Sequence, residues 1–279
     1  MASSDGESLI LIRGAGDLAS GAAYRLVKAG FPVVMTDLAE PLFVRTTVSY
    51  GSCLLYWTVI IEGIVARPAP LEAAAIRETL TDGVIVVVVD PGKAAIDVLH
   101  PAAVIDARLA KINLDTQITD APLVIGLGPG FVAGVDCHAV VETNRGHNLG
   151  RVHWRGCAEP DTGMPGSVGG RTSDRVLRAP VTGYISPFVN IGEFVSKGRL
   201  IARVGDQPVI APFDGVLRGL IDYANELPAG MKIGDIDPRA ERKHCFTISD
   251  KSLAVGGGVV EAIMSSGIFP QPVPSRGSS

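Results

Sequence analysis

The stretch LILIRGAGDLASGAAYRLVKAGFPVVMTD, residues 9–37, is the feature that most constrains the fold of this chain. Residues 9–12 form a short, wholly apolar run, which is typical of a strand buried on both faces of a parallel sheet. A glycine turn follows, then a helical pattern over residues 18–28, and then a second apolar strand over residues 32–36. This order predicts the first βαβ unit of a Rossmann-like α/β sheet.

The glycine turn indicates a nucleotide site. In a GxGxxA turn, Gly14 permits the tight bend, Gly16 lets a phosphate approach the backbone, and Ala19 lets the helix pack closely. Asp37, at the end of the next strand, is placed to accept hydrogen bonds from a ribose. Asp17 departs from this pattern, because a carboxylate at the helix start would cap the helix but repel a phosphate. A structural turn that binds no dinucleotide is the alternative.

The alternation of strands and helices continues beyond this unit. We expect strands at residues 58–65, 83–90, 102–108 and 121–127, and a helix at residues 71–80. Ligands of an open parallel sheet bind outside the carboxyl ends of its strands, so residues at those ends should surround one crevice. Taken singly, each aspartate also fits an ordinary turn at the end of a strand. The strand-end residues are Gly14, Asp37, Asp90, Asp106, Arg108 and Gly126.

Residues 126–150, GLGPGFVAGVDCHAVVETNRGHNLG, hold the second candidate site. A glycine loop opens the stretch, and its backbone amides could face an anion. We predict that this loop forms a headgroup or anion site together with Arg145 and His147. The glycines concerned are Gly126, Gly128 and Gly130.

The segment VDCHAVVET within this stretch alternates like a strand. Such a strand would place Asp136, His138 and Glu142 on one face, as a weak candidate for a divalent metal or a proton relay. The alternative is a strand with one solvated edge, and no strong metal motif is present. Cys137, His138 and His147 are the catalytic candidates, and Cys137 is also a candidate soft ligand or sulfur-group acceptor. A small buried hydrophobic residue is the alternative for Cys137.

Composition excludes several classes of protein. The 25 basic and 29 acidic residues give a net charge of −4, which argues against binding nucleic acid or a membrane through bulk charge. Four widely spaced cysteines indicate reduced thiols and neither a disulfide framework nor a zinc site. Without a transmembrane run or a signal-peptide pattern at the start, the chain is expected to be cytoplasmic.

The second half of the chain contains a repeat. APVTGYISPFVNIGEFVSKGRLIARV and APFDGVLRGLIDYANELPAGMKIGDI align without gaps from Ala179 and Ala211. Two strand-rich units at a fixed offset predict a small two-fold β domain, which resembles the biotinyl/lipoyl-type barrel-sandwich hybrid. The expected hairpin tip, residues 204–209, contains no lysine, so covalent biotin or lipoate is not expected.

These signals divide the chain. We predict a Rossmann-like cofactor-binding domain at residues 8–158, the β domain at residues 175–250, and a C-terminal helix packing back on the first domain within residues 251–268. The linker at residues 159–174 is expected to be exposed and mobile, and the tails at residues 1–7 and 269–279 to be disordered. Three glycines, Gly256–Gly257–Gly258, precede an expected short helix at residues 259–264, as an anion site or a plain turn.

Several longer motifs resemble the YqeB family, accessory proteins of selenium-dependent molybdenum hydroxylase systems. The resemblance covers about residues 8–268, and the first domain is also similar to the Rossmann domain of XdhC-type maturation proteins. It implies a role in maturing a molybdenum hydroxylase. The motifs are RGAGDLASG, IDARLAK, PLVIGLGPGFVAGVDCHAVVETNRGHNLGRV, RAPVTG with APFDGVLRGLI, KIGDIDPR and CFTISDKSLAVGGG.

Three functions therefore stay open at the level of sequence. A maturation factor would bind a molybdenum cofactor dinucleotide or another phosphorylated ligand in the crevice, and its β domain would dock the client hydroxylase. An NAD(P)-dependent oxidoreductase would use Asp37 to favour NAD, with His138 or His147 as proton donor. A non-catalytic scaffold would bind only the client. The sequence decides neither catalysis nor oligomeric state, and it is compatible with a homo-oligomer.

Overall fold

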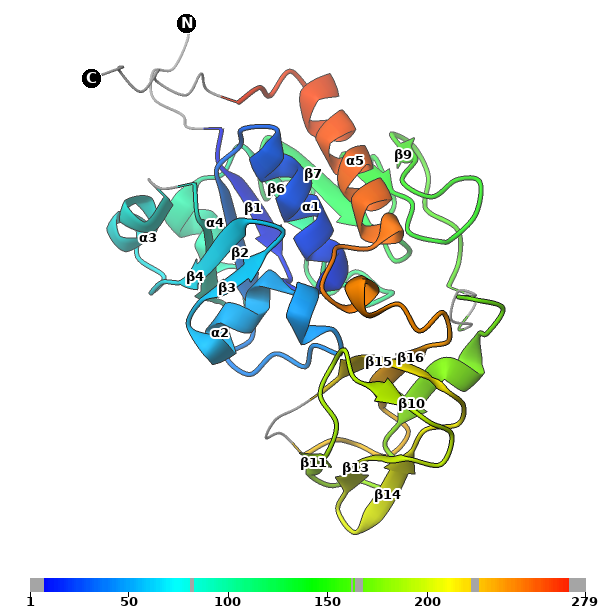
Figure 1. Cartoon of the computed structure of the whole chain (residues 1–279). Helices are drawn as coiled ribbons and strands as arrows, with labels where there is room; N and C mark the ends of the chain where they lie inside the picture. Colours follow the sequence, from blue (N-terminus) through cyan, green and yellow to red (C-terminus); the bar gives the residue numbers. More distant parts are fainter. Residues whose placement is uncertain (1–7, 81–82, 162, 164–167, 222–225, 271–279) are drawn as a thin grey trace, which may run out of the picture.

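A computed structural model describes residues 8–80, 83–161, 163, 168–221 and 226–270. One large, mostly parallel sheet with helices on its faces forms the first part, and two small antiparallel sheets form the second (Figure 1). The chain is thus a mixed α/β protein. The predicted tail at residues 1–7, residues 271–279 of the tail predicted at 269–279, and residues 162 and 164–167 of the predicted linker lie outside the described residues.

The large sheet has the strand order β3-β4-β5-β2-β1-β6-β7-β8-β9. β2 and β5 lie in turn on one side of β1, and β6, β7 and β8 lie in turn on the other side. Each of these strands is parallel to its neighbour. This reversal between β1 and β6 is the topological switch point at which ligands of such sheets bind. These strands are β1 (Ile10–Arg13), β2 (Val33–Asp37), β5 (Ile85–Val89), β6 (Ala103–Asp106), β7 (Leu123–Leu127) and β8 (Ala139–Val141).

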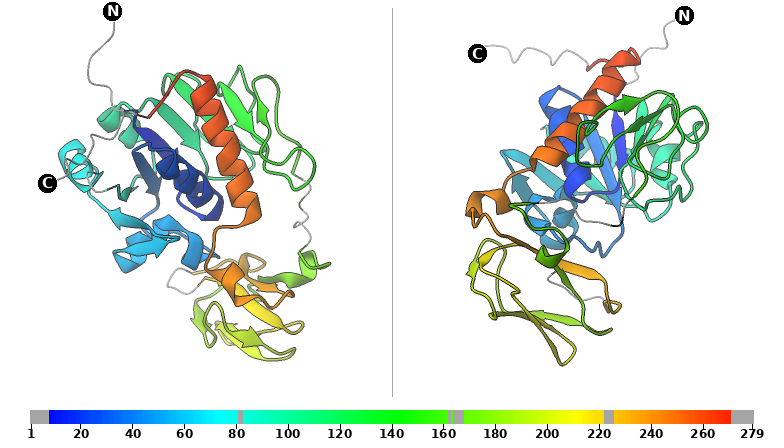
Figure 2. Two further views of the ribbon diagram at one scale, coloured as in Figure 1. Left: turned by 45° about the horizontal axis from the view of Figure 1, so that its top comes forward. Right: turned by 90° about the vertical axis from the view of Figure 1, so that its right-hand side faces the viewer.

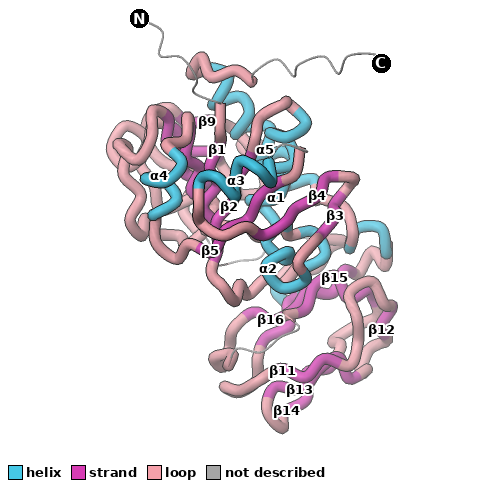
Figure 3. The backbone as a smooth tube through the Cα atoms, turned by 90° about the vertical axis from the view of Figure 1, so that its left-hand side faces the viewer, coloured by secondary structure: helices cyan, strands magenta, loops and turns pink. Residues whose placement is uncertain are grey.

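Antiparallel strands close both edges of this sheet. The expected single strand at residues 58–65 is two strands, β3 (Val59–Ile61) and β4 (Ile64–Pro68), joined as a hairpin that is visible at the edge in Figure 3. Glu62 and Gly63 both have positive φ, so the apolar run reverses there. β9 (Val152–His153) pairs with β8 at the other edge.

Helices cover the two faces of the sheet separately. α1 (Asp17–Lys28) and α5 (Asp250–Ser265) pack on one face, against side chains that include Ile10 and Ile12. α3 (Ala73–Leu80) and α4 (Ala94–Leu99) pack on the other, against Leu9 and Leu11. Figure 2 shows α5 lying beside α1, although the two helices come from opposite ends of the chain. α2 (Cys53–Tyr56) and the 3₁₀ turns η1 (Thr46–Val48), η2 (Tyr50–Ser52), η3 (Ser173–Arg175) and η4 (Arg242–Cys245) complete the helical elements.

The three consecutive glycines near the C-terminus are not a nest before a helix, as the sequence suggested, but lie in the middle of α5. The helix begins earlier, where the Ser249 side chain accepts a hydrogen bond from the Ser252 N–H. A Cβ on Gly256 would lie 2.5 Å from the carbonyl oxygen of Gly21 in α1. The glycines therefore allow α5 to approach its neighbours closely, and the prediction of an anion site there is wrong.

The second part of the chain is a compact β unit. Its four-stranded sheet has the order β10-β16-β15-β12, and its three-stranded sheet the order β11-β13-β14. Aliphatic side chains from both sheets share one buried core. The strands are β10 (Val176–Arg178), β11 (Ile185–Pro187), β12 (Phe194–Val195), β13 (Leu200–Val204), β14 (Gln207–Ile210), β15 (Gly215–Leu220) and β16 (Lys232–Asp237).

Backbone hydrogen bonds in this unit repeat at the offset of the sequence repeat. The Gly198 N–H donates to the Ala211 carbonyl, and the Gly230 N–H donates to the Ala179 carbonyl, both at 2.8 Å. Gly198 aligns with Gly230, and Ala179 aligns with Ala211, so in each bond the glycine of one half donates to the alanine of the other half. Aligned side chains also lie in the same core, as Val195 and Leu227 do. The two halves are thus related by approximate two-fold symmetry.

The β unit packs beyond the carboxyl ends of the parallel strands (Figures 1 and 2). Leu42 and Val44, from the segment after β2, pack against the core of the β unit. Gly219 of β15 makes this approach possible, because a Cβ there would lie 2.6 Å from the Val44 carbonyl oxygen. Among the described residues, none of the helices combines the length and the apolar character that crossing a bilayer requires.

Candidate functional site

A cavity of about 620 Å³ lies at the switch point of the large sheet. Its walls come from the turn after β1, the end of β2, the loop after β5 and the segment after β6. The structure brings several predicted residues together there, from positions up to 94 apart in sequence. These are Gly14, Gly16, Asp17, Asp37, Asp90 and Arg108.

The glycine turn has the backbone that a phosphate-binding turn needs. Gly14 has φ +99°, and a Cβ there would lie 2.8 Å from the Ala107 carbonyl oxygen, so only glycine fits. Gly16 is different, because it has an ordinary φ of −77° and a Cβ would meet only the Phe43 ring, at 3.5 Å. Gly16 therefore leaves space over the start of α1 that a side chain would fill.

Asp37 faces this turn from the end of β2. One carboxylate oxygen accepts the Ala15 N–H at 2.7 Å, and the other accepts the Leu38 N–H at 2.8 Å. Burial raises the pKa of Asp37, and these two hydrogen bonds oppose that rise. The carboxylate thus holds the glycine turn in place while it lines the cavity.

Asp17 does not cap α1, as the sequence suggested. It is the first helical residue, and the N-cap is Gly16, without a side-chain hydrogen bond. The Asp17 carboxylate instead pairs with Arg45 at 2.7 Å and accepts the Ser252 hydroxyl at 2.8 Å. Its charge is therefore compensated, which reduces the repulsion expected for a phosphate at the helix start.

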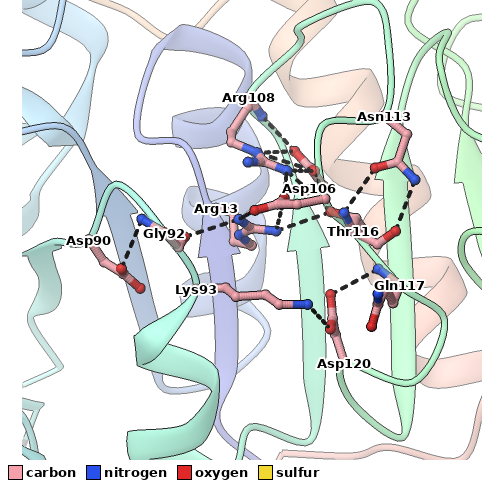
Figure 4. A network of polar contacts seen from close by, with 11 residues as sticks. Arg13, Asp90, Gly92, Lys93, Asp106, Arg108, Asn113, Thr116, Gln117 and Asp120 are labelled. Carbon is pink, nitrogen blue, oxygen red and sulfur yellow. Dashed lines mark hydrogen bonds and ion pairs between the residues drawn. The ribbon is translucent and has the colours of Figure 1, made fainter.

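Asp90 and Asp106 support the loops that form the cavity. Asp90 accepts the backbone N–H groups of Gly92 and Ala95, at 3.1 and 2.8 Å, and so fixes the loop into α4. Asp106 is almost fully buried and binds Arg108 with both oxygens. Figure 4 shows both within one polar network that spans the strand ends.

Arg13, the last residue of β1, is the centre of that network. Its buried guanidinium donates to the Gly92 carbonyl at 3.0 Å, to the Thr116 hydroxyl at 3.1 Å and to Asp115 at 2.9 Å (Figure 4). Arg108 reaches the same Asp115 at 2.6 Å. The network therefore joins the loops on both sides of β1, and the sequence patterns do not single out Arg13 or Asp115.

Asp115 makes the stability of the chain depend on pH. Hydrogen bonds from Arg13, opposed by burial and reinforced by Arg108, lower the pKa of Asp115 from 3.8 to about 2. A lowered pKa stabilises the fold above pH 3.8, and this contribution is lost as the pH falls through about 2. Asp115→Asn should therefore flatten the acid loss of stability measured by urea unfolding between about pH 5 and pH 2. Asp206→Asn, in the exposed β13–β14 turn, is the control. If wild type and Asp115→Asn lose the same free energy of unfolding as the pH falls, Asp115 is not the group responsible.

The glycines of the second loop pack against protein, and within residues 126–130 it is Pro129 that lines a cavity, the one between the large sheet and the β unit. A Cβ on Gly126 would overlap the Phe131 side chain, and one on Gly128 would overlap the Thr143 hydroxyl. Gly130 lies against the Ile112 backbone. These glycines serve close packing. Of the predicted headgroup site, Pro129 of the loop and Arg145 line the same cavity, whereas His147 does not line it.

The predicted polar row is also dispersed. β8 contains only Ala139–Val141, so Asp136 precedes the strand and Glu142 follows it. Each candidate binds the backbone: Asp136 accepts the Val132 N–H, His138 Nδ1 accepts the Val124 N–H, and Glu142 accepts two N–H groups from Asn144 and Glu159. In the described ranges, no three His, Cys, Asp or Glu side chains group to hold a metal ion.

Cys137 is fully buried among apolar side chains. Burial raises the pKa of its thiol to about 11, so the thiolate needed for nucleophilic or metal chemistry is disfavoured. His147 is exposed and lines neither of the cavities described here. The placement of these two residues does not favour the catalytic roles considered for them.

Arg145 lines a second cavity, of about 550 Å³, between the large sheet and the β unit. Arg145 itself forms a two-pronged ion pair with Asp250, at 2.7 and 2.8 Å, which tethers its turn to the start of α5. The lining side chains are mainly cationic. The cations are Arg45, Lys111, Arg145, Arg175, Arg178, Arg218, Lys232 and Lys251, and the carboxylates are Asp17, Glu159, Asp161 and Asp235.

The two cavities meet at Asp17, Leu18, Arg45 and Lys232, which line both. No local motif marks the cations of the second half of the chain, because they are more than 160 residues from Gly14. The sequence carries one signal that could have found Arg218, a single charge within the apolar run GVLRGLI. The fold and these cavities define a two-part α/β protein with a polar site between its parts.

Comparisons with known proteins agree with the resemblance seen in the sequence. The chain is 47% identical over 259 residues to the uncharacterized protein YqeB of Escherichia coli (strain K12). The match covers 93% of this chain and 48% of that protein, so the chain spans about half the length of the curated relative. This similarity supports the resemblance of the chain to the YqeB family. No protein-family model matches the chain.

Among solved structures, the chain is similar to an aspartoacylase family protein from Mesorhizobium loti. The sequences are 12% identical, and the match covers 83% of this chain and 85% of that one, with a TM-score of 0.27. A similarity at this level supports no argument about fold or function.

Proposed function

We propose that the chain binds a phosphorylated, nucleotide-type cofactor where the glycine turn meets the β unit. The observation that carries this proposal is that two cavities share four lining residues, one cavity being lined by Gly14, Gly16 and Asp37 and the other by an excess of cations. The start of α1 offers backbone N–H groups and a favourable helix dipole to a phosphate. Asp37 would accept ribose hydroxyls.

On the resemblance to YqeB, we propose that this ligand is a molybdenum cofactor dinucleotide and that the protein helps to mature a selenium-dependent molybdenum hydroxylase. The pyrophosphate and the anionic terminal groups of such a ligand fit a cationic cavity. The residues that would hold it are Gly16, Asp37, Arg45 and Lys232. The oxidoreductase alternative is less well supported, because His138 and His147 line neither of the two cavities.

We assign client docking to the β unit, which we take for a barrel-sandwich hybrid because its halves repeat their hydrogen bonds. Tyr184, Phe188 and Phe194 are exposed on this unit and offer apolar contacts to a partner. The hairpin tip between β13 and β14 has no lysine to carry a covalent cofactor.

The first test of this proposal is mass spectrometry of small molecules released from protein purified without oxygen, with elemental analysis of the same sample. A pterin dinucleotide, with molybdenum or selenium, is the expected result. NAD or NADP instead would redirect the assignment to an oxidoreductase. Protein that releases no nucleotide and binds neither ADP nor NAD⁺ in calorimetry would contradict the proposal.

Gly16→Ala separates binding from folding. The added Cβ meets only the Phe43 ring at an ordinary distance, so we expect stability to stay within about 1 kcal/mol of wild type. The added methyl group occupies the space through which a phosphate would approach the backbone of the turn. We therefore expect at least a tenfold loss of nucleotide affinity by calorimetry, about 1.4 kcal/mol. Gly257→Ala, at an exposed position of α5 with open space around a Cβ, is the binding control. A Gly16→Ala variant that binds as wild type while still supporting client maturation would favour the scaffold.

A further inference from the structure

Arg218, on β15, is a buried cation whose Nε–H has no hydrogen-bond partner among the described residues. The residue is 7% exposed. Its closest carboxylate contact is 3.8 Å long, from Nη1 to Asp237 Oδ2. Both Asp237 oxygens already accept hydrogen bonds from Arg239, at 2.9 and 2.7 Å. A buried Nε–H without an acceptor is costly, and a hydrogen-bond acceptor in the cavity would reduce this cost.

The surroundings of Arg218 add to this excess of positive charge. Desolvation, the largest cause, lowers the pKa of Arg218, and the nearby Arg45 lowers it further. Desolvation also lowers the pKa of Lys232 and of Lys251, which line the same cavity. Eight cations and four carboxylates line this cavity, which leaves a positive excess. Nearby carboxylates are already engaged, as Asp17 is by Arg45.

We infer that the cavity between the sheet and the β unit is an oxyanion subsite, in which Arg218, Lys232 and Lys251 hold a phosphoryl-type group. The inference rests on the proposed function in taking the two cavities as one site, and it adds the group that the β unit recognises. A guanidinium presents a planar fork that matches two oxygens of a phosphoryl group, whereas lysines act as point charges. The β unit therefore completes the ligand site.

The position of Lys232 supports this assignment independently of Arg218. Lys232 comes from β16 but lines both cavities, so it lies where they meet. Arg45, which is 8% exposed and also lines both, is held there by Asp17 and by the His244 carbonyl. A ligand whose nucleotide part lies over Gly16 can thus place a second charged group against Arg218.

The test uses the full chain and the variant Arg218→Met, with inorganic pyrophosphate and ADP as probes. Methionine keeps much of the side-chain length without the charge. Because a desolvated charge with a buried, unsatisfied Nε–H is removed, the ligand-free variant should have a higher Tm than wild type. Its affinity for pyrophosphate by calorimetry should fall at least tenfold, and the pyrophosphate-induced rise in Tm should disappear. Arg203→Met, on the exposed face of β13, is the matched control.

Lys251→Gln gives a second measurement from the other side of the cavity, and we expect a several-fold weaker affinity for pyrophosphate. If Arg218→Met and Lys251→Gln both bind pyrophosphate as wild type does, the subsite assignment is wrong. ADP that displaces pyrophosphate identifies a phosphoryl group of the nucleotide as the source, and binding of both together identifies a free oxyanion.

The same experiment separates the two proposals. If wild type binds pyrophosphate but neither ADP nor NAD⁺, and Arg218→Met loses that binding, the oxyanion subsite stands and the nucleotide proposal fails. If ADP binds wild type and Arg218→Met equally, while Gly16→Ala weakens it, the nucleotide proposal stands and the subsite fails.

Discussion

Gly258→Ala is expected to lower the free energy of unfolding by about 3 kcal/mol, whereas Gly257→Ala should raise it by about 0.5–1 kcal/mol. The two residues are neighbours in α5, and both have helical backbone. A Cβ on Gly258 would overlap the Gly150 carbonyl oxygen and press on the Val141 side chain. Backbone must move to relieve that overlap, because a carbonyl cannot rotate away as a flexible side chain can.

Gly257 is exposed, and nothing lies within 4 Å of a Cβ there. Alanine at that position gains helix propensity without a clash. Urea unfolding of the two variants measures both effects on the same helix, so each serves as the control of the other. Equal effects of the two substitutions would contradict the close packing of α5 on the turn at Gly150.

Arg13→Met should lower the free energy of unfolding by about 3 kcal/mol. The variant removes a buried guanidinium that joins the Gly92 carbonyl, the Thr116 hydroxyl and the Asp115 carboxylate. The expected loss lies at the lower end for a buried pair, because the Asp115 side chain is 38% exposed and retains Arg108. The loops on both sides of β1 should loosen together, since Arg13 is their shared contact.

Urea unfolding measures the stability of Arg13→Met, and amide hydrogen exchange of the two loops measures their loosening. Arg77→Met is the matched control, because Arg77 is exposed on α3, and its effect should stay within about 0.5 kcal/mol. A loss below 1 kcal/mol for Arg13→Met, with unchanged exchange in the loops, would show that the network does not hold them.

The elements that the sequence predicted well depend on neighbours in the chain. The turn at Gly14 and Gly16, with strands on each side of a helix, follows from local apolar runs and from the backbone freedom of glycine. α1 begins at Asp17, one residue before the predicted start, and β2 includes Asp37. The β repeat also predicted a compact two-fold unit, because the same local pattern folds in the same way twice.

The errors arose where distant contacts override local pattern. Glycines 256–258 break helices by propensity, but contacts with Gly21 and Gly150 require a small residue at Gly256 and Gly258 within α5. The alternation from Asp136 to Glu142 suggested one polar face, yet only three of those residues are in a strand. Their polar side chains instead satisfy backbone N–H groups of loops, which no periodicity reveals.

The sequence by itself determined the parallel sheet, the glycine turn and the repeated β unit, because each depends on short-range patterns of apolar residues and glycine. Only the tertiary structure decided where the charges gather. Arg218 and Lys232 lie in the other half of the chain from Gly16, and Asp17 has its charge compensated by Arg45. Burial and ion pairing depend on which surfaces meet after the two parts fold, so the cationic cavity exists only in the assembled fold.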